Sequence, residues 1–168
     1  MSNHECYIGI DNGVSGSVGI ISPTKKEFFA TPTFSEQDYV KKKTNITRVN
    51  CIYLMEVFEA YKDFTTMVVL ERPMVNPTRF AATKSALRAL EATLIAIEVY
   101  DFSVMYIDSK EWQSVMLPKG TKGTPDLKKA SRDIGCRLFP EFKSQILKTK
   151  KSDADGILIC EWARRKNL

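Results

Sequence analysis

The chain is almost without histidine. His4 is the single histidine among 168 residues, and it stands at the N-terminus, where chain ends are seldom tied down. A serine–histidine–aspartate triad and a histidine-ligated zinc site are therefore not expected. Any catalysis by this chain must rest on carboxylates, lysines and hard metal ions.

Paired cysteines and long apolar runs are also missing. The four cysteines, Cys6, Cys51, Cys136 and Cys160, are far apart and form no Cys-x-x-Cys pair, which predicts free thiols in a reducing cytoplasm rather than disulfides or zinc ligands. No run approaches the ~20 apolar residues of a membrane span, and the first residues do not resemble a signal peptide. We expect a cytoplasmic protein with no membrane partner and no organic cofactor.

The positive charge is unevenly distributed. Residues 109–168 hold 14 basic and 7 acidic side chains, whereas residues 1–108 hold 11 basic and 13 acidic ones, for a net charge of +5. A basic C-terminal third is typical of a protein that meets a polyanion, although lysines also serve solubility alone. Charge by itself does not decide between these readings.

Hydrophobic patterning predicts one α/β domain over residues 1–168. Apolar residues make up 43% of the chain and charged residues 27%, as in ordinary globular proteins. Strands are expected at 7–11, 17–21, 27–32, 66–71 and 103–107, and helices at 47–61, 84–100, from 108, 126–138 and 152–166. Strand–helix–strand units after three hairpin-linked strands predict a mixed five-stranded sheet with helices on both faces.

Two acids follow strands that this topology places side by side. Asp11 and Glu71 each end an apolar run, at the sheet edge where ligands of α/β proteins usually bind. A carboxylate that ends a core strand must be compensated, because an unpaired buried charge costs several kcal/mol or takes up a proton. The alternative for Glu71 is an exposed pair with Arg72.

A third acid comes from the last predicted helix. Asp155, Leu158, Ile159 and Trp162 recur at helical spacing, so Asp155 is expected on the face that packs on the sheet. Asp153 lies roughly 200° around such a helix and fits a partner of the helix dipole. Acids without histidine or cysteine suit Mg²⁺ or Mn²⁺, and two ions about 3.5–4 Å apart would serve phosphodiester hydrolysis.

Five motifs follow one another along the chain: Gly9-Ile10-Asp11-x-Gly13-x-Ser15-Gly16, Leu70-Glu71-Arg72-Pro73, Lys110-x-Trp112-Gln113, Leu138-Phe139-Pro140, and the segment from Asp155 to Trp162. In this order they resemble a RuvC-like Holliday junction resolvase of the RNase H-like superfamily, of the bacteriophage type. The similarity covers nearly the whole chain.

The resemblance implies an RNase H-like endonuclease that acts as a homodimer on four-way junctions or other branched DNA. It would nick two strands symmetrically, leaving 5′-phosphates, in the host cytoplasm if a phage encodes it. The implied catalytic residues and ligands of two Mg²⁺ or Mn²⁺ ions are Asp11, Glu71, Asp153 and Asp155. In the family the last helix usually carries two acids three residues apart, but here Ser152 stands three residues before Asp155.

Several further side chains are expected to contact DNA. These are Lys110, Lys119, Lys122, Lys128, Lys129, Arg79 and Phe80. For each single lysine the alternative is a solvated surface charge. The family places a base-stacking Phe where this chain has Met74, so Phe80 is the candidate for insertion at the junction. Trp112 is expected in the core.

Two other functions remain open at this point. The irregular spacing of the last acids is compatible with a non-cleaving protein that binds or scaffolds DNA junctions. The segment Ile8-Gly9-Ile10-Asp11-x-Gly13 also resembles a phosphate loop of actin-like ATPases, but those folds need two such lobes and this chain has room for one.

Overall fold

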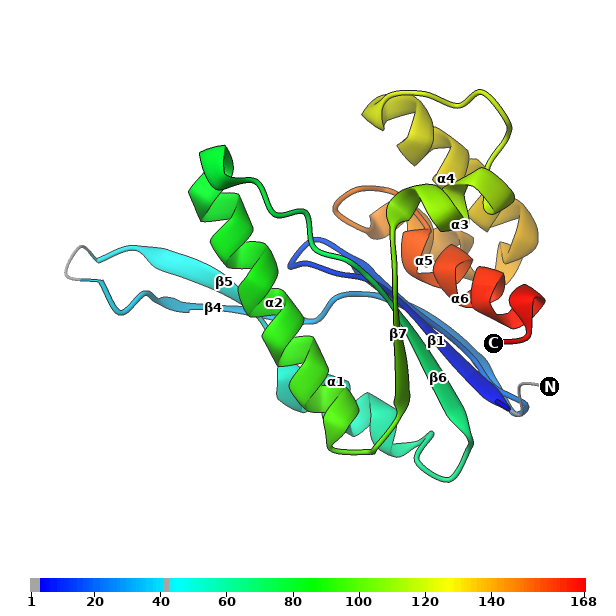
Figure 1. The fold of residues 1–168 in the computed structure, drawn as a ribbon, viewed down its shortest axis with the longest axis horizontal. Helices are drawn as coiled ribbons and strands as arrows, with labels where there is room; N and C mark the ends of the chain where they lie inside the picture. Colours follow the sequence, from blue (N-terminus) through cyan, green and yellow to red (C-terminus); the bar gives the residue numbers. More distant parts are fainter. Residues whose placement is uncertain (1–3, 41–42) are drawn as a thin grey trace.

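A mixed five-stranded sheet forms the centre of the molecule (Figure 1). The computed structural model describes residues 4–40 and 43–168. The sheet strands, in the spatial order β3-β2-β1-β6-β7, are β1 (Cys6–Asp11), β2 (Ser17–Ile21), β3 (Lys26–Ala30), β6 (Thr66–Glu71) and β7 (Ser103–Ile107). β1, β2 and β3 pair antiparallel, whereas β1, β6 and β7 pair parallel. The predicted sheet is confirmed.

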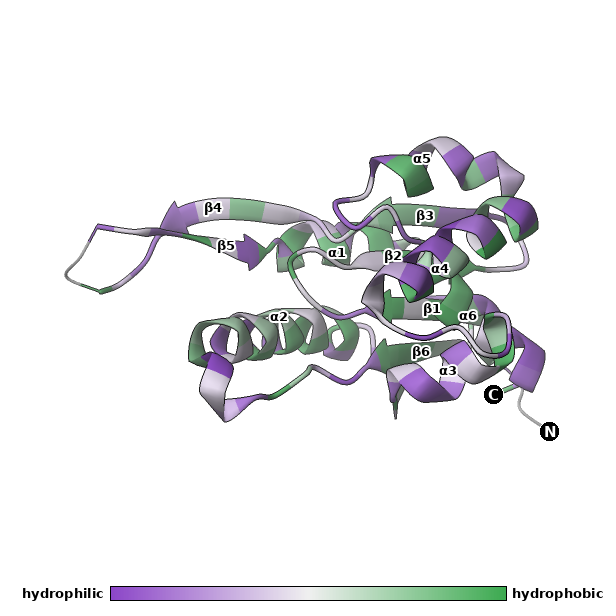
Figure 2. Ribbon diagram, turned by 90° about the horizontal axis from the view of Figure 1, so that it is seen from above, coloured by the Kyte–Doolittle hydropathy of each residue, from purple (hydrophilic) through white to green (hydrophobic). Residues whose placement is uncertain are grey.

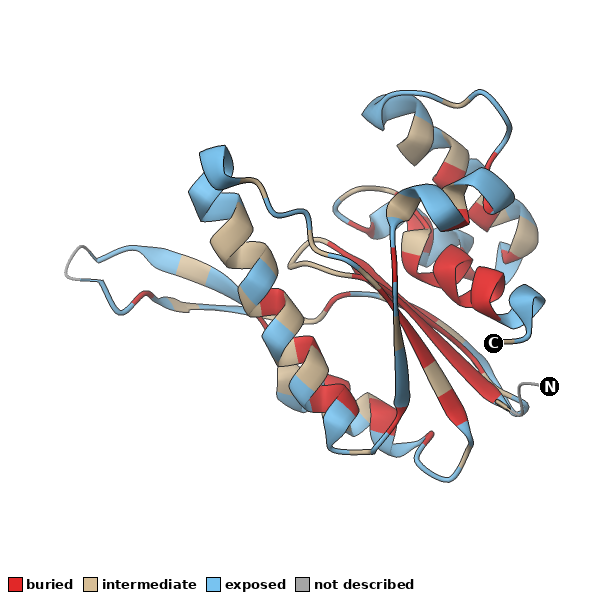
Figure 3. Cartoon of the chain, in the orientation of Figure 1, coloured by how far each residue is buried: buried red, intermediate tan, exposed pale blue. Residues whose placement is uncertain are grey.

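Helices cover both faces of this sheet (Figures 1 and 3). Their bounds are α1 (Cys51–Glu59), α2 (Phe80–Glu98), α3 (Ser109–Met116), α4 (Thr124–Leu138), α5 (Lys143–Lys148) and α6 (Asp155–Lys166), with short 3₁₀ turns η1 (Pro77–Arg79) and η2 (Pro140–Phe142). Alternate strand residues separate two cores: Ile8 and Val68 pack with α1 and α2, and Tyr7 and Val69 pack with α3 to α6. This alternation follows from the two-residue repeat of a strand.

Helix α6 lies directly on β1 and β2 because glycines leave room for its backbone. A Cβ on Gly9 would stand 2.2 Å from the Cys160 nitrogen, and one on Gly156 would stand 2.5 Å from the Ser17 carbonyl oxygen. The Gly156 N–H also donates to Ser17 Oγ at 3.0 Å. The first turn of α6 is thereby fixed at the end of β1, next to Asp11.

A projecting hairpin replaces the first turns of a predicted helix. The helix expected at 47–61 is wrong before residue 50, because β4 (Thr33–Gln37) and β5 (Asn45–Val49) pair antiparallel. α1 begins only after Asn50, whose side chain accepts the Tyr53 N–H at 3.1 Å as an N-cap. Residues 41 and 42, which fall between β4 and β5 in the sequence, lie outside the described residues.

Two helix starts and one additional helix also differ notably from the prediction. α2 begins at Phe80 rather than residue 84, because η1 runs straight into it. α6 begins at Asp155 rather than residue 152, and the short α5 was not predicted. The start of α6 matters for the site, because it leaves Asp153 outside the helix.

The structure also describes the cysteines, the N-terminus and the lengths of the helices. All four cysteines are free thiols, with Cys6 and Cys160 buried. His4, expected in a loose terminus, lies with its Nδ1 2.8 Å from the main-chain oxygen of Leu168, so the two ends meet. In the described parts of the chain, the longest helices fall short of the apolar length needed to cross a bilayer.

Candidate metal centre

Asp11 and Glu71 stand at the ends of adjacent parallel strands. They follow Ile10 and Leu70, which are paired in the β1–β6 register. Asp11 is only 6% exposed, and Glu71 is half-buried. The Trp112 indole Nε1 donates to Glu71 Oε2 at 2.8 Å. Trp112 is a core residue as predicted, and it also fixes the direction of Glu71.

Asp153 and Asp155 complete a cluster of carboxylates with Asp11. One oxygen from each of these three acids lies within 4.8 Å of the others. Asp153 reaches the cluster because Ser152 adopts a positive φ of 48° and the helix has not yet begun. The dipole-partner reading of Asp153 is therefore wrong, since this side chain is 1% exposed and points into the site. Ser152 instead lies near the Leu147 carbonyl oxygen.

Hydroxyl groups from two neighbouring elements hold the acids in place. Ser131 Oγ of α4 donates to Asp155 Oδ1 and accepts the Ala154 N–H at 3.0 Å. Thr149 Oγ1 accepts the Asp153 N–H at 3.1 Å. These bonds fix the irregular segment before α6, so the carboxylates meet in a preformed arrangement.

Two lysines neutralise part of the cluster. Lys151 Nζ lies 3.0 Å from Asp11 Oδ2, and Lys128 Nζ lies 3.3 Å from Asp153 Oδ2. Lys128 was predicted to bind DNA, whereas Lys151 was missed. The signal for it was the Lys150-Lys151 pair directly before the acidic motif, but its contact with Asp11 depends on the turn at Ser152.

Burial and repulsion between carboxylates raise the pKa values of Asp11, Glu71 and Asp155. Desolvation raises the pKa of Asp11 more than Lys151 lowers it, and Asp153 adds to the increase. Burial, then Asp153 and Asp11, raise the pKa of Asp155 well above its usual range. The pKa of Glu71 rises to about 7, mainly by burial and then by Asp11. The fold thus holds the carboxylates close together despite their desolvation and mutual repulsion, as functional sites often do.

This donor set fits a divalent cation. Every candidate ligand atom is a carboxylate oxygen, which Mg²⁺ and Mn²⁺ prefer. A cation between Asp11, Asp153 and Asp155 would relieve the repulsion that contributes to the raised pKa values of Asp11 and Asp155. Glu71 lies outside this group of three within the described residues, but it lines the same cleft as Asp11.

Asp11 and Glu71 line a cleft whose walls carry basic side chains. Its volume is about 710 Å³, and its lining includes Asp11, Glu71, Arg72, Arg79 and Lys110. Lys151 lines it as well. Positive side chains around an acidic floor suit a ligand that carries anionic groups along its length and meets a cation at one point.

No protein-family model matches the chain, and no curated protein matches its sequence. Among solved structures, Thermus thermophilus RuvC in complex with a Holliday junction substrate aligns with a TM-score of 0.59 at 13% identity, over 96% of this chain and 93% of that chain. A second Thermus thermophilus RuvC structure aligns with a TM-score of 0.50 at 13% identity, over 96% of each chain. This chain has the RuvC fold.

The RuvC fold confirms the predicted RNase H-like fold class, while the bacteriophage type stays a prediction. Of the predicted DNA-contacting residues, the structure brings Arg79 and Lys110 to the cleft wall and Lys128 to the acidic cluster. Lys119, in the loop before α4, and Lys129, in α4, line a separate pocket that none of the four candidate ligands lines. Lys122 is exposed on that loop. Arg72 was missed as a residue of the cleft wall.

Phe80, the candidate for insertion at a junction, and Met74, at the position of the family's base-stacking Phe, line different hollows beside the start of α2. Met74 lines the same cleft as Asp11 and Glu71, and it is 81% exposed. Phe80 is 72% exposed but lines a second groove, between α2 and the β4–β5 hairpin. Insertion of Phe80 at a junction therefore stays a prediction, and Met74 has the better position for a contact within the cleft.

Proposed function

We propose that this protein is a metal-dependent endonuclease that resolves Holliday junctions or related branched DNA. The observation that carries the proposal is the group of Asp11, Asp153 and Asp155, of which Asp11 also lines a cleft with basic side chains in its walls. Such a site suits hydrolysis of a phosphodiester, because the backbone is anionic and its cleavage develops further negative charge.

The fold supports the choice of substrate. The structural neighbour described above was solved as a complex of RuvC with a Holliday junction substrate. The basic balance of residues 109–168 agrees with a DNA partner. Four-way or branched DNA is therefore the substrate that we propose, with symmetric nicks made by a homodimer.

The four acids are the proposed metal ligands, for Mg²⁺ or Mn²⁺. When bound, two such ions supply activation of a water molecule and stabilisation of the leaving oxygen. Asp11, Asp153 and Asp155 would hold the ions from the floor of the site, and Glu71 would join them from β6. Trp112 keeps Glu71 oriented through its 2.8 Å hydrogen bond.

The basic side chains would bind and orient the DNA backbone. Arg72, Arg79 and Lys110 line the cleft on the side of β6, α2 and α3. Lys151 touches Asp11 and also lines the cleft, so it can reach a phosphate next to the metal ligands. Lys119, Lys122 and Lys129 would contact phosphates farther from the cut.

The decisive experiment is cleavage of a synthetic four-way junction in a titration with Mg²⁺ and Mn²⁺. We expect paired nicks in the native protein, and loss of nicking with retained junction binding in Asp11→Asn. The matched control is Asp63→Asn, because Asp63 is exposed in the turn before β6. Normal cutting by Asp11→Asn would refute the assignment of the site.

The same experiment separates the nuclease from a non-cleaving junction scaffold. The scaffold was suggested by the irregular spacing of the last acids. The position of Asp153 beside Asp11 and Asp155 removes that reason, because the turn at Ser152 compensates for the spacing. Tight junction binding without nicks at any metal concentration would favour the scaffold instead.

A further inference from the structure

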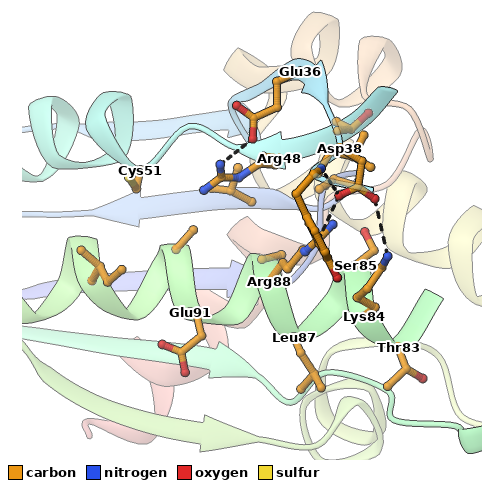
Figure 4. A pocket seen from close by; sticks show the side chains of 18 of the residues that line it. Glu36, Asp38, Arg48, Cys51, Thr83, Lys84, Ser85, Leu87, Arg88 and Glu91 are labelled. Carbon is orange, nitrogen blue, oxygen red and sulfur yellow. Dashed lines mark hydrogen bonds and ion pairs between the residues drawn. The ribbon is translucent and has the colours of Figure 1, made fainter. Parts of the chain in front are cut away.

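The two long helices near the acids lie on opposite faces of the sheet and hold different parts of the fold. α2 packs on one face, and α4 packs with α6 on the other (Figures 1 and 2). The ion pairs of α2 join Lys84 and Arg88 to Asp38 in the walls of a groove of about 750 Å³ (Figure 4). The described lining of this groove includes none of the four candidate ligands. α4, in contrast, contacts the acidic segment before α6 directly.

Three positions on one face of α4 meet this segment. Lys128 Nζ lies 3.3 Å from Asp153 Oδ2. Ser131 follows three residues later, and Gly135 four residues after that, a spacing that keeps all three on one side of a helix. A Cβ on Gly135 would stand 2.2 Å from the Cβ of Ala154, so the two backbones are close. The helix therefore contacts the segment with one cation, one hydroxyl and one residue that has no side chain.

Ser131 is the contact that fixes Asp155 from outside its own segment. Its Oγ accepts the Ala154 N–H at 3.0 Å and donates to Asp155 Oδ1. A serine hydroxyl has a single hydrogen, so this hydrogen is committed to the carboxylate. Ser131 is 1% exposed, and bulk water therefore does not compete for either bond. Thr149, the other hydroxyl beside the acids, bonds instead within its own segment.

A fixed carboxylate matters more to some cations than to others. Mg²⁺ demands near-ideal octahedral geometry with oxygens at about 2.0–2.1 Å, whereas Ca²⁺ takes about 6–8 oxygens at about 2.3–2.6 Å in a flexible arrangement. Groups behind a metal ligand orient it, and their loss typically costs about 10–100-fold in metal affinity. A carboxylate that gains freedom to rotate should therefore weaken Mg²⁺ binding more than Ca²⁺ binding.

We propose that Ser131 is a positioning residue that makes the site selective for Mg²⁺ over Ca²⁺. This step rests on the proposed metal site, and Ser131 acts through Asp155 rather than on the cation itself. With the hydroxyl in place, the Asp155 carboxylate cannot rotate without loss of its hydrogen bond, and it meets Asp11 and Asp153 in one orientation. Without the hydroxyl, the carboxylate can turn and the Ala154 N–H loses its acceptor. The segment can then adapt to a larger ion.

Calorimetric titrations with Mg²⁺ and with Ca²⁺, both without DNA, test the proposal. We expect Ser131→Ala and Ser131→Cys to bind Mg²⁺ about tenfold more weakly than the native protein does. Their affinity for Ca²⁺ should stay within about threefold of the native value, because Ca²⁺ tolerates irregular ligands. The cysteine variant fills the space of the hydroxyl with a weak donor. The matched control is Ser114→Ala, because Ser114 Oγ donates to the Glu111 carbonyl oxygen within α3 at 2.9 Å.

The ratio of the two affinities separates positioning from a general structural role. Circular dichroism shows whether each variant is folded. Equal weakening of Mg²⁺ and Ca²⁺ binding, or unchanged Mg²⁺ binding in a folded variant, would overturn the proposal. Failure of both variants to fold would overturn it too, because Ser131 would then serve the fold. A native protein that binds neither cation would refute the proposed metal site itself, whereas native binding with an unchanged ratio in the variants refutes only the role of Ser131.

Discussion

Replacement of Glu71 by glutamine is expected to stabilise the metal-free protein while it abolishes metal-dependent cutting. The carboxyl has a pKa of about 7 in the fold, against the 4.5 that is usual for a glutamate side chain. The folded state therefore binds this proton more tightly than the unfolded state does. The contribution of Glu71 to the free energy of unfolding must therefore fall as pH rises from 4.5 to about 7, and it does not return at higher pH.

The size of the effect follows from the difference between those two pKa values. It corresponds to at most about 3 kcal/mol of folding free energy. Glutamine is neutral at every pH and still offers an oxygen to the Trp112 indole, so Glu71→Gln recovers this energy without loss of the 2.8 Å hydrogen bond. For a chain of this length, the gain corresponds to a Tm increase on the order of 5–10 °C at pH 8.

Thermal and urea unfolding with EDTA, at pH 5 and pH 8, measure this effect. At pH 5 the folded native protein already carries a proton on Glu71, so the two proteins should differ little. Addition of Mn²⁺ at pH 8 should stabilise the native protein more than the variant, since ligand binding to the folded state shifts unfolding. An equal or lower Tm of the variant at pH 8 would refute the reasoning.

Glu161→Gln provides a control of opposite sign. Burial raises the pKa of Glu161, but hydrogen bonds from Arg164 and Arg165 outweigh it, so the net pKa is lowered. The charge of this carboxylate is therefore favourable in the fold, and its removal should lower the Tm at pH 8. If both variants shifted the Tm in the same direction, the charge of Glu71 would not be the cause.

Three further outcomes are expected. Asp153→Asn should weaken Mn²⁺ binding in calorimetry whereas Ser152→Ala should not, because only Asp153 lies in the cluster; equal effects would contradict this placement. Lys151→Gln should tighten Mn²⁺ binding without DNA, on the order of tenfold, because it removes a cation 3.0 Å from Asp11; unchanged affinity would contradict that role. Junction binding to the native protein should weaken steeply with salt, with a log–log slope of about −0.9 per neutralised phosphate, and a flat dependence would contradict a phosphate-binding cleft.

The sheet and two of its acids were predictable because their signals are local. The runs before Asp11 and Glu71 are continuous and apolar, and such runs become buried central strands. Parallel neighbours then bring their ends to one edge. Trp112 was also expected in the core, although only the structure shows that its indole bonds to Glu71.

The sequence does not predict the β4–β5 hairpin because the helical pattern that follows it is read too far toward the N-terminus. Residues 54, 57, 58 and 61 have helical spacing, and the predicted helix begins seven residues before the first of them, at Thr47. The residue that ends this extension is Asn50, a strong N-cap type, and the β-branched Ile46, Thr47 and Val49 before it favour a strand. An N-cap inside a predicted helix is thus better read as its start.

Asp153 and Lys151 could not be placed by periodicity at all. Both positions depend on one residue, Ser152, whose left-handed conformation breaks the helical geometry on which the angular argument relied. A non-glycine residue with positive φ is uncommon and carries no reliable sequence signal. Backbone strain of this kind often accompanies functional sites, and here it turns Asp153 toward Asp11.

The charge balance of the site gives a reason for its two lysines. Asp11, Glu71, Asp153 and Asp155 carry four negative charges when ionised, and Lys128 and Lys151 return two of them. One divalent cation would neutralise the remainder with both lysines in place. Two divalent cations would neutralise all four acids by themselves, and the charges of Lys128 and Lys151 would then be free for other partners; of the two lysines, Lys151 lines the cleft. If two ions bind, metal binding and phosphate binding would be coupled, because lysines that no longer neutralise the acids could contact the DNA backbone.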